Sequence, residues 1–535
     1  MMNIASLLAA VNDPDRPAII FSGTNESMLT FRGLDDLSSR LAAGMDAAGL
    51  RAGERVIVLA PISPMLYAGL IALFKLGITA VFLDPQTGFR QLNRAVELAD
   101  ARAIIGTRRT MWLGAVFPAL RRIEVKFITE GNGARSLRRL ALTFSPRTEI
   151  ADVEDEHPAL ITFTGGGTDS SPRGVLRTHR LLIEQHHALS RILPVQENDV
   201  DMPAFPVATL HNLASGIPSV IPDFPFRQPA AVQPDKILRQ IHRQGITTAS
   251  GSPAYWSAIV KFCLRNKVKL PLRRIVMGGA PTSPNLMKQL SCIAPNAEVL
   301  NLYGSTEAEP VAVLRLEDVS DEVTGRIERG SGIPLGRSVP EACVRILDEN
   351  RAERPVNQVG EIWVSGGHVA RGYFSNPKAD AVNKYLSADG KLWHCMGDVG
   401  CMDADGCLWL VGRVNTVIMR DGEPIHPIPA ETIVETLAFV RRAALVGAAD
   451  RILGERTVLF VEFSKDVSLP ENWRTIIQSL LSERGCVADE IRPIRKLPVD
   501  VRHNARIDYQ KLKEFFSRRR NPIPLWEITK GREIP

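Results

Sequence analysis

The chain has 535 residues, of which 45% are hydrophobic and 23% are charged, and its formal net charge is +6. A chain of this length does not fold around one compact core, so we expect at least two domains. The composition is ordinary for a soluble globular protein. The modest positive charge is compatible with anionic small-molecule substrates and argues against a nucleic-acid-binding protein.

The sequence predicts neither a cysteine-based metal site nor an export signal. The seven cysteines lack CxxC or Cys/His spacing, which indicates reduced thiols. The N-terminus lacks a basic segment, and Asp13 and Asp15 interrupt it early, unlike a signal peptide. The nearest approach to a membrane-spanning stretch, 65–81, contains Lys75. We therefore expect a cytoplasmic protein with no integral membrane segment.

Helical periodicity alternates with short apolar or β-branched runs across residues 15–225. The runs predict strands at 55–59, 80–83, 103–105 and 126–128. Alternation of this kind indicates a layered α/β architecture. A stretch rich in proline and turn formers, 203–234, contains the apolar piece 219–221.

The alternation resumes at residue 239. We expect strands at 246–249 and within 274–280, the second ending in a glycine turn at a sheet edge, where ligands of open α/β sheets bind. From 341 to 411 the pattern becomes rich in strands. These are predicted at 343–347, 360–364 and 407–411. The segment 412–422 then looks like a domain junction.

Four short polar segments in a fixed order indicate a nucleotide site. They are a glycine- and threonine-rich loop at 162–174, Tyr-Gly-Ser-Thr-Glu at 303–307, Gly-Asp at 397–398 and Gly-Arg at 412–413. The first exposes backbone N–H groups and hydroxyls to a phosphate chain. The second places a hydroxyl beside a carboxylate, which suits a magnesium–phosphate site. The last two offer an acceptor and a cation for a ribose and its phosphate, so the set predicts an ATP site with Mg²⁺.

The loop at 162–174 is the predicted phosphate-binding element. Its candidate contacts are Thr164, Gly165, Gly166, Gly167, Thr168 and Arg173. Glycines permit close approach and positive φ, threonines supply hydroxyls and the arginine supplies charge. No Gly-Lys-Ser/Thr follows, so this loop is not the P-loop of kinases and GTPases.

The order and spacing of these segments resemble the adenylate-forming superfamily of acyl-CoA synthetases, luciferases and peptide-synthetase adenylation domains, over nearly the whole chain. The resemblance implies that a carboxylate attacks the α-phosphate of ATP to give acyl-AMP and pyrophosphate, and that a nucleophile then displaces AMP. It also implies a large N-terminal AMP-binding domain, residues 1–413, and a small α+β C-terminal domain, residues 414–535. The small domain would rotate about a hinge at Asn415.

The same resemblance assigns roles to single residues. Tyr303 would stack on adenine, Thr306 would contact the α-phosphate and Glu307 would coordinate Mg²⁺. Asp398 would accept both ribose hydroxyls, and Arg413 would reach the ribose and phosphate. The other candidate nucleotide contacts are Gly279, Ala280, Pro281, Gly304 and Ser305. The plainer alternatives are an ordinary strand-end turn, a turn aspartate and a structural salt bridge.

Two regions depart from the family pattern. In the phosphate loop, Gly165 and Gly167 replace hydroxyl residues, Asp169 adds a carboxylate and Arg173 stands in place of lysine. These changes are expected to weaken phosphate binding. Near the C-terminus, Arg506 stands where most members carry a lysine that bridges the substrate carboxylate and ATP. Arginine keeps the charge but not the compact ammonium shape, so Arg506 is either catalytic or simply surface charge.

Further segments resemble a narrower group, the β-lactone synthetases of bacterial head-to-head olefin biosynthesis. These segments are 203–206, 219–223, 251–254, 310–313 and 499–505. The resemblance implies a β-hydroxy fatty acid whose hydroxyl closes on the acyl-AMP, without CoA, to give a β-lactone. It also implies pathway enzymes that supply this acid. His211 lies near the expected acyl pocket; it either helps deprotonate this hydroxyl or is a packed or capping histidine.

Two other functions stay open from the sequence. A fatty acyl-CoA or acyl-carrier-protein ligase would keep the enzyme class and change the acceptor. A degenerate homologue that binds nucleotide without turnover is suggested by the altered loop and Arg506. The presence of Thr306, Glu307, Asp398 and Arg413 argues against it.

Overall fold

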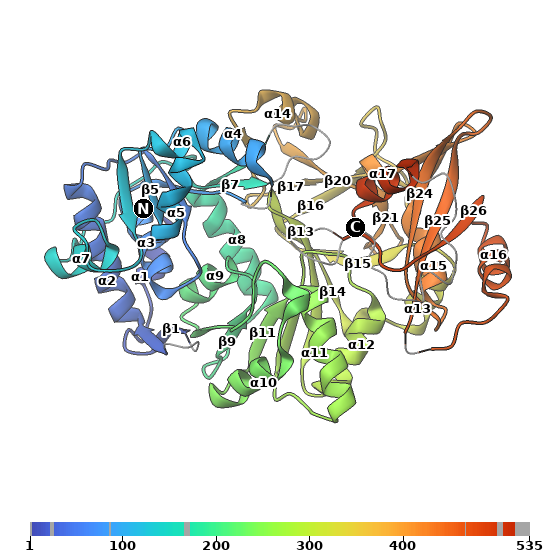
Figure 1. The fold of residues 1–535 in the computed structure, drawn as a ribbon, viewed down its shortest axis with the longest axis horizontal. Helices are drawn as coiled ribbons and strands as arrows, with labels where there is room; N and C mark the ends of the chain where they lie inside the picture. The colour runs from blue at the N-terminus through green and yellow to red at the C-terminus, as the bar shows by residue number, and fades with distance from the viewer. Residues whose placement is uncertain are drawn as a thin grey trace.

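A computed structural model describes residues 3–21, 26–84, 87–164, 172–465, 467–499 and 507–518. Side chains are described in all of these except Thr164, Ser517 and Arg518. This part of the chain forms three sheets with helices between and around them. In Figure 1 the seven-stranded sheet lies on the left, the large sheet occupies the centre and the C-terminal sheet lies on the right.

The seven-stranded sheet is a mainly parallel sheet with helices on both faces. In sheet order its strands are β18 (Tyr373–Phe374), β8 (Arg173–Thr178), β7 (Pro158–Thr164), β4 (Thr79–Phe82), β3 (Arg55–Leu59), β5 (Ala103–Gly106) and β6 (Val125–Ile128). Strands β3 to β7 pair in parallel, and β8 returns antiparallel along β7. Alternate residues of β3 face opposite cores: Val56 packs with α2 and α3, whereas Ile57 packs with α4. Burial on both faces explains the continuous apolar runs of these strands.

The central sheet changes from parallel to antiparallel pairing at β13. In sheet order its strands are β16 (Cys343–Leu347), β17 (Gly360–Ser365), β20 (Leu392–Met402), β21 (Cys407–Arg413), β15 (Ile333–Ser338), β14 (Ala308–Arg315), β13 (Glu298–Ser305), β12 (Arg274–Met277), β11 (Thr248–Gly251), β9 (Asp201–Pro203), β10 (Ser219–Ile221), β1 (Pro17–Phe21) and β2 (Ser27–Thr30). Strand β19 (Lys384–Leu386) pairs with β20. Strand β13 runs parallel to β12 and antiparallel to β14, so the β13–β14 hairpin lies where the two kinds of pairing meet.

The C-terminal sheet is formed by residues that follow Arg413. Its strands are β23 (Glu423–Ile425), β22 (Ile418–Arg420), β25 (Gly454–Phe463) and β24 (Val440–Asp450), with β26 (Glu490–Ile494) on β25. Helices α15 (Pro427–Glu435) and α16 (Trp473–Glu483) share a core with this sheet, and α17 (Tyr509–Arg518) packs against β24. A domain boundary at residues 413–414 stays a prediction.

Capping side chains begin many of the remaining helices. These helices are α1 (Ile4–Ala9), α2 (Phe31–Ala47), α3 (Pro64–Lys75), α4 (Phe89–Ala99), α5 (Arg108–Trp112), α6 (Pro118–Arg121), α7 (Leu137–Thr143), α8 (His179–Ile192), α9 (Ala208–Ala214), α10 (Pro234–Arg243), α11 (Pro253–Asn266), α12 (Pro284–Ile293), α13 (Asp321–Glu328) and α14 (Pro377–Asn383). The hydroxyl of Thr178 accepts a hydrogen bond from Leu181 N and so begins α8, a wall of the site described below. Ser252 caps α11 in the same way, with Pro253 in the first turn.

The layered α/β fold predicted from the sequence is confirmed, and most predicted strands agree with the structure to within one or two residues. The strand predicted at 246–249 is displaced: β11 begins at Thr248. Ile246 still belongs to the turn after α10, because its N–H donates to the carbonyl of Ile241 and Gly245 has φ +60°.

The apolar stretch 65–81 is not a membrane span. It comprises most of the buried helix α3 and strand β4. Lys75 at the end of α3 is paired with Asp35 (2.6 Å) and Ser39 (2.7 Å), which explains a buried lysine there. None of the helices in the described ranges is long and apolar enough to cross a membrane.

Candidate active site

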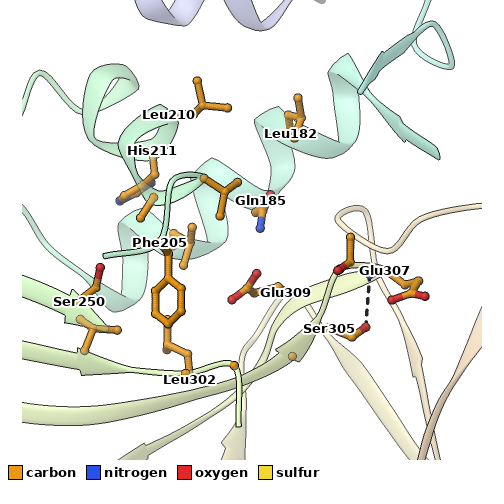
Figure 2. A pocket seen from close by; sticks show the side chains of 18 of the residues that line it. Leu182, Gln185, Phe205, Leu210, His211, Ser250, Leu302, Ser305, Glu307 and Glu309 are labelled. Carbon is orange, nitrogen blue, oxygen red and sulfur yellow. Dashed lines mark hydrogen bonds between the residues drawn. The ribbon is translucent and has the colours of Figure 1, made fainter. Parts of the chain in front are cut away.

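A cavity of about 780 Å³ lies at the carboxyl ends of β11 and β12, beside the β13–β14 hairpin. Helices α8 and α9 form another wall, as Figure 2 shows for Leu182, Gln185, Leu210 and His211. The predicted site residues that line the cavity are Arg173, His211, Gly279, Gly304, Ser305, Thr306, Glu307, Arg413 and Asn415. Segments far apart in the sequence thus meet at one place, where open sheets usually bind ligands.

The β13–β14 hairpin presents its turn to the cavity. Ser305 pairs with Ala308 across the turn, which leaves Thr306 and Glu307 at the tip. The Glu307 N–H donates to the hydroxyl of Ser305 at 3.3 Å. A Cβ at Gly304 would lie 2.8 Å from the carbonyl oxygen of Ala308, so this tight return requires glycine.

Asp398 is held between two donors just behind the cavity lining. The Tyr303 hydroxyl donates to its Oδ2 at 2.7 Å, and Nε of Arg413 donates to its Oδ1 at 2.8 Å. Asp398 is 8% exposed, and its neighbour Gly397 lines the cavity. An ionised carboxylate offers about four acceptor positions, so Asp398 keeps acceptor capacity for two further hydroxyls. Its charge in turn raises the pKa of the Arg413 guanidinium.

Glu307 is kept ionised in a partly buried position. Burial raises the pKa of its carboxyl, yet His394, the Tyr373 hydroxyl and Lys384 together hold that pKa below its ordinary value. The Tyr373 hydroxyl donates to Oε1 at 3.0 Å and fixes the carboxylate orientation. An ionised carboxylate with unused acceptor positions at a cavity wall has the chemistry to hold a divalent cation.

One end of the predicted phosphate loop, Arg173, lines the cavity. Thr164 is the last residue of β7 and pairs with Arg173, the first residue of β8. The Arg173 guanidinium lies 6.0 Å from the centre of the Tyr373 ring, a cation–π contact. The other predicted contacts, Gly165, Gly166, Gly167 and Thr168, lie outside the described residues, and so does Arg506.

One further predicted nucleotide contact follows the end of strand β12. Gly279 lines the cavity directly after the strand end and has φ +79°, a conformation that favours glycine. Ala280 and Pro281 follow this glycine and are not part of the lining. Thr282 then donates to Asn301 at 2.8 Å, which fixes the segment against β13.

The predicted hinge residue lies at the edge of the same cavity. Asn415 is in a short 3₁₀ helix, Val414–Thr416, directly after β21. Thr416 Oγ1 accepts from the N–H of Arg413 at 3.1 Å and donates to the Arg413 carbonyl at 3.0 Å. The segment that leaves the ribose candidate Arg413 is therefore ordered by its own short-range hydrogen bonds.

His211 lies in the wall formed by α8 and α9 and is paired with a second histidine. Its Nδ1 is 3.1 Å from Nδ1 of His186, so one ring donates and the other accepts. Burial, together with the His186 ring, lowers the pKa of His211 to about 3. Burial and the neighbouring His187 lower that of His186 to about 4. Both rings are therefore neutral near pH 7, and the role of His211 as a base stays a prediction.

Part of the cavity lining is polar, and most of its polar side chains hydrogen-bond to one another. Asp201 accepts hydrogen bonds from Asn212 (2.8 Å) and Thr248 (2.6 Å), and burial raises the pKa of Asp201 to about 6. Ser250 differs, because its buried hydroxyl has no hydrogen-bond partner among the described residues. Polar groups at this depth suit a ligand that offers more than an alkyl chain.

Comparison with known proteins decides the family. The family model described as "AMP-binding enzyme" matches residues 8–374. The olefin beta-lactone synthetase of Stenotrophomonas maltophilia is 32% identical over an alignment 508 residues long that covers 90% of this chain and 90% of the relative. That of Xanthomonas campestris pv. campestris is 30% identical over an alignment 515 residues long, which again covers 90% of each of the two chains.

The chain belongs to the AMP-binding enzyme family. It is therefore an adenylate-forming enzyme, a class that uses ATP. Two solved structures of similar fold are ATP-bound MatB from Rhodopseudomonas palustris, with TM-score 0.82 and 21% identity, and the amide bond synthetase McbA from Marinactinospora thermotolerans, with TM-score 0.80 and 22% identity. Each alignment covers 96% of this chain and 99% of the other. At these identities the likeness concerns the fold alone.

Sequence reasoning about this family member missed several cavity residues. Glu309 lies on β14, two positions after Glu307 at the hairpin tip, and a second carboxylate so close to the predicted Thr306 and Glu307 was the available signal. Gln185 and Tyr373 also line the cavity, and Arg177 is hydrogen-bonded to Gln185. They are isolated residues in α8, β18 and β8, and no local pattern distinguishes them from ordinary core or surface positions.

Proposed function

We propose that this protein uses ATP and Mg²⁺ to activate a β-hydroxy fatty acid as its acyl-AMP, and that the β-hydroxyl then closes on the acyl carbon to give a β-lactone. The observation that carries the proposal is the 32% and 30% identity to two olefin beta-lactone synthetases over 90% of both chains. Relatives with other acceptors, such as 4-coumarate–CoA ligase 5 of Oryza sativa subsp. japonica, share 28% identity over 84% of this chain.

The geometry around Asp398 suits the nucleoside of ATP. Its two oxygens each accept one protein hydrogen bond, which leaves one further acceptor position on each for the 2′ and 3′ hydroxyls. Tyr303 lies beside this carboxylate, so its ring is the candidate adenine contact. Arg413 and Arg173 both line the cavity and bring positive charge to it.

Glu307 and Thr306 are the candidate phosphate-end groups. The ionised Glu307 carboxylate, oriented by Tyr373, would hold Mg²⁺. When bound, this ion would neutralise charge on the phosphates as pyrophosphate departs. The Thr306 hydroxyl lines the cavity at the hairpin tip and would hydrogen-bond the α-phosphate.

The second step needs no external nucleophile. The hydroxyl oxygen bonds to the acyl carbon, the bond from that carbon to the AMP phosphate oxygen breaks, and the hydroxyl proton is released. The acid therefore loses one water overall, and AMP leaves. Because the attacking group belongs to the substrate, proximity replaces a second binding event. We further propose that residues 414–535 rotate about Asn415 between the steps, with Arg506 near the substrate carboxylate during the first.

The test is pyrophosphate release from Mg-ATP with paired simple and β-hydroxylated fatty acids, without CoA. Mass spectrometry of the organic product accompanies it. The expected result is release that depends on the β-hydroxyl, with a product 18 Da lighter than the acid, the mass of one water. A pathway enzyme that makes β-hydroxy acids is the expected supplier of the substrate.

Other outcomes point to the alternative functions. Release with simple acids and a product that forms only after CoA or carrier protein is added would identify an acyl ligase. ATP binding without release for any acid would identify a non-catalytic homologue. Either outcome contradicts the proposal.

A further inference from the structure

Two polar side chains face one another across the acyl side of the cavity. Gln185 of α8 and Glu309 of β14 both line it. In Figure 2 the nitrogen end of Gln185 points toward the Glu309 carboxylate, with Phe205 beside them. Gln185 is buried at 6% exposure, whereas Glu309 is half-buried. These two residues are called the amide–carboxylate pair below.

Arg177 fixes the orientation of the amide. Its Nη2 donates a hydrogen bond to Oε1 of Gln185. A guanidinium has donors only, so the amide oxygen must face Arg177 and the amide nitrogen must face away from it, into the cavity. Arg177 is itself buried at 7% exposure, and its charge also acts on Glu309. The amide therefore presents donors, and not an acceptor, to any ligand.

Glu309 presents the complementary group. No described side chain donates a hydrogen bond to its carboxylate, in contrast to Glu307, which accepts one from Tyr373. Its acceptor positions are therefore available to a donor on a ligand, and an alkyl chain carries no such donor.

The position of the pair matches the first carbons of an acyl chain. Glu309 lies on β14, two residues after Glu307, which is in the turn at the tip of the β13–β14 hairpin. Glu307 and Thr306 lie at the proposed phosphate end, so Glu309 lies where the chain would leave the carboxyl group. The β-oxygen of a hydroxy acid is only three bonds from the acyl carbon.

We propose that the amide–carboxylate pair binds the β-hydroxyl of the substrate acid and selects hydroxylated acids over plain ones. A hydroxyl donates one hydrogen bond and accepts another, so it donates to Glu309 and accepts from Gln185. This inference rests on the proposed function and names the residues that recognise the β-hydroxyl of its substrate. The bound hydroxyl is held next to the acyl carbon that it attacks.

The test compares a 3-hydroxy fatty acid with the unsubstituted acid of equal length in the full-length protein. The variants are E309L, Q185L and the double variant, and the control is E184Q, a neighbour on α8 outside the cavity lining. The measurement is kcat/KM for pyrophosphate release. E309L is expected to lower kcat/KM about 10- to 100-fold for the hydroxy acid and to leave the much lower value for the plain acid within about threefold. An unchanged Kd for ATP shows that the variant is folded.

The double variant tests whether the two residues act on one group. Because both bind the same hydroxyl, Q185L is expected to cost less in the E309L background than alone. E184Q should behave as wild type. Equal losses for both acids, or no loss for the hydroxy acid, would overturn the inference.

The product separates this inference from the proposed function. In one outcome, the preference for the hydroxy acid depends on Glu309, but the product is a thioester that forms only when CoA is added. This outcome would support hydroxyl recognition and overturn lactone closure. In the other outcome, the lactone forms and E309L keeps the wild-type preference for the hydroxy acid. This outcome would support lactone closure and overturn hydroxyl recognition by Glu309.

Discussion

Replacement of Asp398 by asparagine tests the nucleotide assignment with a nearly isosteric change. In the native site Oδ1 accepts from Arg413 and Oδ2 accepts from Tyr303. Nε of Arg413 can only donate, so the amide oxygen of D398N must take the Oδ1 position. The amide nitrogen then replaces Oδ2 and can donate to the Tyr303 oxygen. The protein network survives, but one of the two ribose hydroxyls faces a donor in place of an acceptor.

The expected loss is one hydrogen bond to a charged acceptor. Such a bond contributes about 1.5–3 kcal/mol, which corresponds to an increase of roughly 10- to 100-fold in the Kd for ATP. Isothermal titration of ATP in the absence of acid measures this Kd without turnover. The control D405N changes an exposed aspartate in the turn between β20 and β21 and should leave the Kd unchanged.

A ligand without ribose hydroxyls makes the test specific. With 2′,3′-dideoxy-ATP the difference between wild type and D398N is expected to disappear, because neither protein has a hydroxyl to bind. If D398N weakens dideoxy-ATP as much as ATP, Asp398 acts through the structure of the site and the ribose assignment is refuted. Unchanged ATP binding by D398N would refute it as well.

Three further changes test other parts of the chain. Y373F removes the hydroxyl that orients Glu307, so pyrophosphate release should fall about tenfold and require more Mg²⁺; an unchanged Mg²⁺ dependence contradicts this role. Burial raises the pKa of Glu431 from 4.5 to about 8. The native state therefore keeps a proton that the unfolded chain releases, and the free energy of unfolding falls as the pH rises from 4.5 to about 8. The melting temperature of E431Q should therefore rise relative to wild type between about pH 5 and about pH 8.5, and a constant difference contradicts the assignment. R506K restores the lysine that most family members carry at this position. A loss of pyrophosphate release would show that the site is adapted to arginine, and a large gain would show that arginine weakens the native site. No change would show that Arg506 is surface charge.

The parts of this protein that could be predicted from its sequence are those with a repeating or clustered signal. Strand β3 coincides with the predicted run at 55–59, because a strand buried on both faces must be apolar throughout. The hairpin tip at 303–307 and the pair Asp398 and Arg413 were identifiable because each is a short cluster in a fixed order. Their meeting at one cavity depends on the pairing of β20 with β21, which joins Asp398 to Arg413 in register. That pairing is a tertiary fact without a local signature.

The two carboxylates of the β13–β14 hairpin show why local sequence could not assign their roles. They are two residues apart and face the same cavity, yet their pKa values shift in opposite directions. Around Glu307, the effects of His394, the Tyr373 hydroxyl and Lys384 together outweigh burial and favour the ionised form, which suits a cation. Around Glu309, burial outweighs the charge of Arg177 and raises the pKa, which suits a hydrogen bond with a neutral group. The partners that distinguish the two come from β8, β18, β19 and β20, so the assignment exists only once the sheets are assembled.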